Sequence, residues 1–130
     1  MPASPPTPDR RVLRDVAIGG AAGALLRAGC LAVAVVLAGA DLPGVVFVNL
    51  LGAALLGRLM AASRQDPRWA ARGPLLATGG LGAFTTYSGL VVPLALLVDD
   101  GAPFAAVAWG LGSLAAGVWL ARRGLGRVGG

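Results

Sequence analysis

Residues 79–88 read Gly-Gly-Leu-Gly-Ala-Phe-Thr-Thr-Tyr-Ser and lie in the middle of a long apolar segment. The three glycines and two adjacent threonines lower the helix propensity of this stretch. Inside hydrocarbon, an interrupted helix is tolerated only where protein or a watery cavity satisfies the freed backbone groups. We therefore predict that residues 79–88 interrupt a membrane helix and form an ion or ligand site, with carbonyls for a cation and hydroxyls for an anion.

The composition is typical of an integral membrane protein. The 130 residues are 56% hydrophobic, with a mean hydropathy of +0.75, and the 21 glycines favour closely packed helices. The chain has no histidine and a single cysteine, Cys30, which excludes a Cys/His zinc site and histidine acid–base chemistry. No carboxylate lies inside an apolar span, which argues against proton-coupled drug export. We expect no enzymatic activity and no nucleic-acid binding, because the arginines flank apolar spans instead of gathering on one soluble face.

The hydropathy pattern predicts an all-α membrane fold with four transmembrane helices, the third of them interrupted. The expected spans are Val16–Ala38, Gly44–Ala62, Pro74–Val98 and Phe104–Ala121. Residues 1–15 are expected to be a disordered cytoplasmic lead, residues 16–121 the four-helix membrane domain, and residues 122–130 a cytoplasmic tail. Residues 63–73 are expected to form a solvated loop, and residues 39–43 and 99–103 tight turns.

Arginine is distributed very unevenly around these spans. Ten arginines precede the first span, surround the second loop or follow the fourth span: Arg10, Arg11, Arg14, Arg58, Arg64, Arg68, Arg72, Arg122, Arg123 and Arg127. With four crossings these regions share one side of the membrane, and the opposite turns carry only Asp41, Asp99 and Asp100. Because loops rich in arginine stay in the cytoplasm, we expect both termini there and a single orientation in the membrane.

Three polar features lie at membrane depth. A mid-span arginine costs roughly 2.5 to 3.5 kcal/mol to insert, so Arg27 should face a cavity or passing anion, or else bind helix-end carbonyls. Asn49 is suited either to donating to an anion or to bonding a neighbouring helix. The hydroxyls of Thr85, Thr86, Tyr87 and Ser88 follow one another directly, which is more than isolated back-bonding to a helix would explain.

Three motifs in this order resemble the small four-helix Fluc (CrcB) fluoride channels. They are Gly19-Gly20-Ala21-Ala22-Gly23-Ala24-Leu25-Leu26-Arg27, Gly44-Val45-Val46-Phe47-Val48-Asn49-Leu50-Leu51-Gly52, and residues 79–88. The resemblance implies an antiparallel (inverted) dimer with two fluoride pores, and passive fluoride export that lowers the cytoplasmic concentration. It further implies a central structural sodium ion held by the backbone carbonyls of Gly82 and Thr85.

The resemblance also assigns the anion path. Asn49, Thr86, Tyr87 and Ser88 correspond to pore positions, with Arg27 near a vestibule. The positive edge of the Tyr87 ring suits an anion. The sequence departs from the family's usual pattern at Val45, Ala53, Gly89 and Leu90, and Leu90 takes the place of a second pore aromatic.

An antiparallel homodimer needs a chain that inserts both ways, whereas the arginine bias favours one orientation. We therefore expect a heterodimer with an oppositely oriented paralogous subunit, in contact with membrane lipid. Two alternatives stay open at this stage. Either this subunit conducts fluoride, or it is a non-conducting structural subunit that completes the pore of its paralogue.

Overall fold

The computed structural model describes residues 9–126, which are helical apart from short connections. Its elements are α1 (Arg10–Ala38), α2 (Asp41–Gln65), α3 (Pro67–Ala71), the π-helix η1 (Pro74–Leu81), α4 (Gly82–Phe84), α5 (Ser88–Asp99) and α6 (Pro103–Gly126). Four segments are long and apolar enough to cross a membrane: α1, α2, the interrupted run Pro74–Asp99, and α6. The expected all-α, four-span architecture is confirmed, as is an interruption in the third span.

The helices extend further than the expected spans. α1 begins at Arg10, six residues before Val16, because Asp9 caps it: the Asp9 carboxylate accepts the Arg11 N–H at 2.9 Å. α6 likewise continues past Ala121 to Gly126. Residues 10–15 and 122–126, which we expected in a disordered lead and a tail, are therefore helical. The remainder of those two segments, 1–8 and 127–130, lies outside the described residues.

The connections are also tighter than expected. α1 ends at Gly39, whose left-handed φ of 66° favours glycine, and α2 begins two residues later at Asp41. The solvated loop contains the one-turn helix α3, which Asp66 caps by accepting the Arg68 N–H at 2.8 Å. Gly101, with φ of 80°, turns the chain from α5 into α6.

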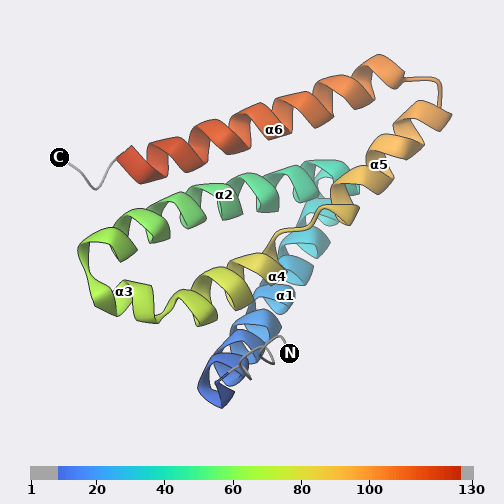
Figure 1. Ribbon diagram of the computed structural model, residues 1–130. Helices are drawn as coiled ribbons and strands as arrows, with labels where there is room; N and C mark the ends of the chain where they lie inside the picture. Colours follow the sequence, from blue (N-terminus) through green and yellow to red (C-terminus); the bar gives the residue numbers. More distant parts are fainter. Residues whose placement is uncertain (1–8, 127–130) are drawn as a thin grey trace, which may run out of the picture.

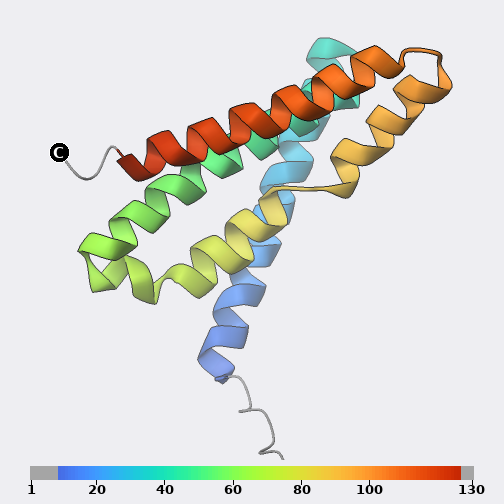
Figure 2. The same cartoon turned by 45° about the horizontal axis from the view of Figure 1, so that its top comes forward.

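α2 lies at the centre of the bundle. α6 runs alongside α2, and the first half of the third span lies between α2 and the obliquely crossing α1 (Figures 1 and 2). Among residues 9–126, α2 supplies most of the buried apolar side chains, including the fully buried Val48. Many other large apolar side chains are exposed, as befits a surface that meets lipid or a partner.

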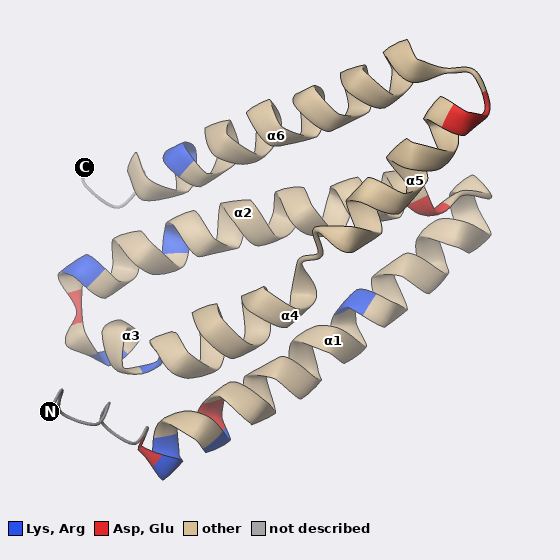
Figure 3. Cartoon of the chain, turned by 45° about the vertical axis from the view of Figure 1, so that its right-hand side comes forward, with Lys and Arg blue, Asp and Glu red and all other residues tan. Residues whose placement is uncertain are grey.

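The charges are polarised along the bundle. The start of α1, α3 and the end of α6 share one end, which carries almost all of the arginines, and Asp41, Asp99 and Asp100 lie at the other end (Figure 3). The arginine-rich segments thus lie at one end of the bundle, as expected from counting spans.

Candidate functional site

The third span is interrupted at Thr85–Tyr87. α4 ends at Phe84, the backbone of Thr85 is extended (φ −84°, ψ 158°), and α5 begins at Ser88. The glycines that we expected to break the helix, Gly79 and Gly80, instead lie within η1. The break therefore falls on the hydroxyl-bearing half of the motif, and the term "break" below means residues 85–87.

The glycines serve close packing between α1 and the third span. A Cβ on Gly19 would collide with the Leu75 carbonyl, and a Cβ on Gly23 with the Gly80 carbonyl. Gly19, Gly23 and Arg27 are four residues apart, so they share one face of α1. This face follows the third span up to the break, which explains why Arg27 arrives there.

Arg27 binds the break from α1. Its Nη1 donates to the Thr85 carbonyl oxygen at 3.2 Å, in a partly buried setting. Within residues 9–126 no carboxylate pairs with this guanidinium. Of the two environments considered from the sequence, the bond to a helix-end carbonyl is the one observed. A guanidinium has five N–H donors, so Arg27 brings an uncompensated positive charge and further donors to the break.

Asn49 binds the break from α2 through both atoms of its amide. Nδ2 donates to the Thr86 carbonyl oxygen, and Oδ1 accepts the Thr86 N–H, each at 2.8 Å. The side chain thus replaces the helix partners that Thr86 lacks. Nδ2 retains a second N–H.

One turn further along α2, Gly52 makes room for the break. A Cβ there would collide with the Thr85 methyl group, so any larger residue would require the Thr85 side chain to move. Gly52 stands three residues after Asn49 in the second motif, but no role was predicted for it.

The hydroxyls of the break are partly committed to the backbone. Thr85 Oγ1 donates to the Leu81 carbonyl at 3.0 Å, and Thr86 Oγ1 accepts the Gly89 N–H at 3.1 Å. Thr86 Oγ1 also lies 3.4 Å from Ser88 Oγ. Ser88 and Tyr87 are exposed, and Tyr87 is 83% exposed. Tyr87 and Ser88 are therefore exposed on the surface of their own chain, whereas Thr86 is half-buried.

A cleft of about 420 Å³ opens beside the break, between α2 and the third span. Polar groups of the break and of Asn49 meet an otherwise apolar lining. The lining residues are Asn49, Gly52, Ala53, Leu56, Ala77, Leu81, Gly82, Thr85, Thr86 and Tyr87. Five of the seven residues predicted for the site thus line one cleft. Ser88 adjoins Tyr87 in the chain, and Arg27 reaches Thr85 from α1.

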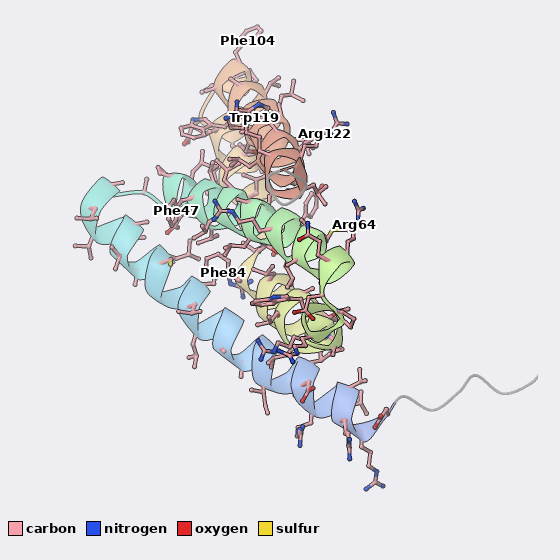
Figure 4. All side chains as sticks on the ribbon, turned by 90° about the vertical axis from the view of Figure 1, so that its left-hand side faces the viewer. Phe47, Arg64, Phe84, Phe104, Trp119 and Arg122 are labelled. Carbon is pink, nitrogen blue, oxygen red and sulfur yellow. The ribbon has the colours of Figure 1, made fainter. Side chains whose placement is uncertain are left out.

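Phe84, next to the break, is buried in the interior of the bundle. Its ring is 7% exposed and lies between α1 and α2 (Figure 4). Leu90 is half-buried in the first turn of α5, and a Cβ on Gly89 would lie 2.7 Å from the Thr86 methyl group. Two of the four positions that depart from the family pattern, Gly89 and Leu90, therefore border the break.

Comparison with known proteins agrees with this architecture. The family described as "CrcB-like protein, Camphor Resistance (CrcB)" matches residues 15–125. A protein of Thermus thermophilus named "Fluoride-specific ion channel FluC" is 39% identical over 116 residues, which are 88% of this chain and 92% of the relative. "Fluoride-specific ion channel FluC 2" of Thermobifida fusca is 46% identical over 82 residues, 62% of this chain and 60% of the relative. "Fluoride-specific ion channel FluC 1" of Lactiplantibacillus plantarum is 40% identical over 80 residues, 61% and 66% of the two chains.

Proposed function

The chain belongs to the CrcB-like protein family, and we propose that it is a multi-pass membrane subunit of a fluoride-specific channel that exports fluoride passively from the bacterial cytoplasm. The observation that carries the proposal is the set of hydrogen bonds that hold the break. Arg27 and Asn49 hold the backbone of Thr85 and Thr86 from two helices and leave hydroxyls and donors at an open cleft in the third span.

A fluoride ion that crosses the membrane must exchange its hydration shell for donors supplied by the protein. The proposed path offers the second N–H of Asn49, the hydroxyls of Thr86 and Ser88, and the positive edge of the Tyr87 ring. The charge of Arg27 lowers the electrostatic cost of bringing an anion to this depth. Each group by itself binds fluoride only weakly, and weak binding favours conduction because the ion must also leave each site.

We also propose a structural sodium ion held by the carbonyls of Gly82 and Thr85. In a continuous helix the Thr86 N–H would donate to the Gly82 carbonyl, but here it donates to Asn49, and Gly82 is exposed. The Gly82 carbonyl therefore suits a cation. The Thr85 carbonyl has one lone pair for sodium and accepts Arg27 with the other. One chain offers two such carbonyls, so a complete site requires a second chain.

The proposed assembly is an antiparallel heterodimer with a paralogous subunit whose arginines lie on the opposite loops. The polarised arginines of this chain support one orientation, with both termini in the cytoplasm and the chain in the inner membrane (Figure 3). The numbered names of the T. fusca and L. plantarum relatives support the occurrence of paralogues in those organisms. A homodimer remains the outcome that would refute this part of the proposal.

Fluoride efflux from liposomes tests the function. Asn49→Asp loses the donor to Thr86, and Tyr87→Ile loses the aromatic edge, so each should lower efflux by about tenfold or more. Tyr87→Phe is the matched control, since it keeps the ring and should retain most of the flux.

The same assay separates the conducting subunit from the structural alternative. Each substitution is made in this chain and, in parallel, in its partner. If only the partner's substitutions reduce flux, this chain is a structural subunit, although the names of its relatives favour conduction. Robust efflux by a stable antiparallel homodimer of this chain alone would refute the heterodimer.

A further inference from the structure

Near the arginine-rich end of the bundle, the backbones of α2 and α6 come into close contact, as those of α1 and the third span do elsewhere. A Cβ on Gly57 would collide with the Ala121 carbonyl. A Cβ on Gly124 would lie 2.8 Å from the Arg58 backbone nitrogen and 2.9 Å from the Ala54 carbonyl oxygen. The two helices therefore touch through small residues at one crossing.

Three arginines flank this contact, and we name them the crossing arginines: Arg58, Arg122 and Arg123. Arg58 directly follows Gly57, while Arg122 and Arg123 stand between the two α6 residues that touch α2. All three are exposed, and Arg122 projects outward from the bundle (Figure 4). Across residues 9–126 none of them pairs with a carboxylate, because the one ion pair there joins Arg14 to Asp15. The crossing thus concentrates positive charge without a counter-charge from its own chain.

Their depth identifies the kind of counter-charge. Arg58 lies seven residues, about 10 Å at 1.5 Å per residue, before the end of α2, and Arg122 and Arg123 lie in the last turns of α6. Long side chains at this depth extend toward the membrane interface, where lipid phosphates lie. The Arg123 guanidinium is 4.0 Å from the centroid of the Trp119 ring, a residue type enriched at that interface.

We propose that the crossing arginines bind the phosphate of an anionic phospholipid, with phosphatidylglycerol as the probe, in the leaflet on the arginine-rich side. Guanidinium groups recognise phosphate through paired N–H donors, and three arginines next to one helix crossing favour an anionic lipid over a zwitterionic one. The bound lipid bridges α2 and α6 where their own charges repel.

Thermal unfolding of the full chain in micelles doped with phosphatidylglycerol or phosphatidylcholine tests this proposal. Phosphatidylglycerol should raise the Tm of the unmodified chain by roughly 4 to 8 °C relative to phosphatidylcholine. In the variant Arg58→Gln/Arg122→Gln/Arg123→Gln this difference should vanish. The control Arg10→Gln/Arg11→Gln/Arg68→Gln removes the same charge from exposed sites elsewhere. In this control the Tm difference between the two lipids should persist. Each variant is its own reference, so a lower baseline Tm does not affect the comparison.

Lipid retention in native mass spectrometry supplies a second measurement. The unmodified chain should retain phosphatidylglycerol, and the milder single variant Arg122→Lys, which keeps the charge but loses the fork of donors, should retain several-fold less. Equal stabilisation by both lipids would overturn the proposal. If the control variant lost the Tm difference as well, the effect would come from overall positive charge and the proposal would fail. If inorganic phosphate raised the Tm as much as phosphatidylglycerol does, the site would bind free anions instead of lipid.

Discussion

The two halves of the third span, before and after the break, are packed in opposite ways. The first half, η1 and α4, lies so close to α1 that no side chain fits at Gly19, Gly23 or Gly79, and it buries Phe84. The second half, α5, has no buried residue, and Val92 and Leu96 are more than half exposed. The first half is therefore fixed to its own chain, while the apolar surface of the second half is left for lipid or another subunit.

The difference between the halves depends on the junction between them. Asn49 and Arg27 supply the hydrogen bonds that a continuous helix would have supplied, so the chain can change direction at membrane depth without exposing unpaired backbone to hydrocarbon. Loss of that support should affect both halves, whereas a change within one half should remain confined to it.

The largest effect is expected from Asn49→Leu, which leaves the N–H and the carbonyl of Thr86 without partners. Each unsatisfied group costs about 1 to 3 kcal/mol, so the free energy of unfolding should fall by roughly 2 to 6 kcal/mol. Titration of the purified protein with a denaturing detergent measures it. The control on the same helix is Ser63→Ala, whose hydroxyl bonds only the Leu59 carbonyl of its own helix, at 2.7 Å, and which should cost under about 0.5 kcal/mol. Equal losses would mean that Asn49 does not hold the junction.

A smaller effect, confined to the first half, is expected from Gly23→Ala. The new methyl group would collide with the Gly80 carbonyl and push α1 away from η1, at about 1 to 3 kcal/mol. Gly20→Ala is the matched control, because nothing lies within 4 Å of a Cβ there. The same detergent titration should separate the two variants. If Gly20→Ala were the more damaging one, the close approach of α1 and η1 would be refuted.

The glycines show where sequence reasoning reached its limit. Apolar length and turn residues predicted four spans to within a few residues, because burial in lipid requires about 20 apolar residues whatever the tertiary contacts. Glycine propensity, by contrast, placed the start of the interruption at Gly79, six residues before the observed break begins at Thr85. A propensity cost of about 1 kcal/mol per glycine is overridden when the missing Cβ lets two backbones touch, as at Gly79 and Gly23.

The sequence predicted which residues form the site but not which groups they bond. Arg27, Asn49 and the hydroxyl run stood out because polar groups at membrane depth require a reason. That Arg27 meets Thr85, and Asn49 meets Thr86, depends on how α1 and α2 are shifted along the third span. Many small contacts along whole helices determine the positions of α1 and α2 relative to the third span, and no short sequence pattern predicts those positions.

The smallest effects are expected from the two threonines of the break, which resemble each other in sequence but differ in bonding. Thr86→Val removes the acceptor of the Gly89 N–H at the start of α5 and should cost about 1 kcal/mol, as for loss of a helix cap. Thr85→Val removes only a bond from the side chain to the Leu81 carbonyl, which already accepts the Thr85 N–H at 3.0 Å, so a few tenths of a kcal/mol are expected. Hydrogen exchange of α5 amides localises the change: faster exchange at Gly89 in Thr86→Val alone would tie the second half to the junction through one hydroxyl. Equal exchange in both variants would show that α5 is anchored by its packing on α2 and α6 instead.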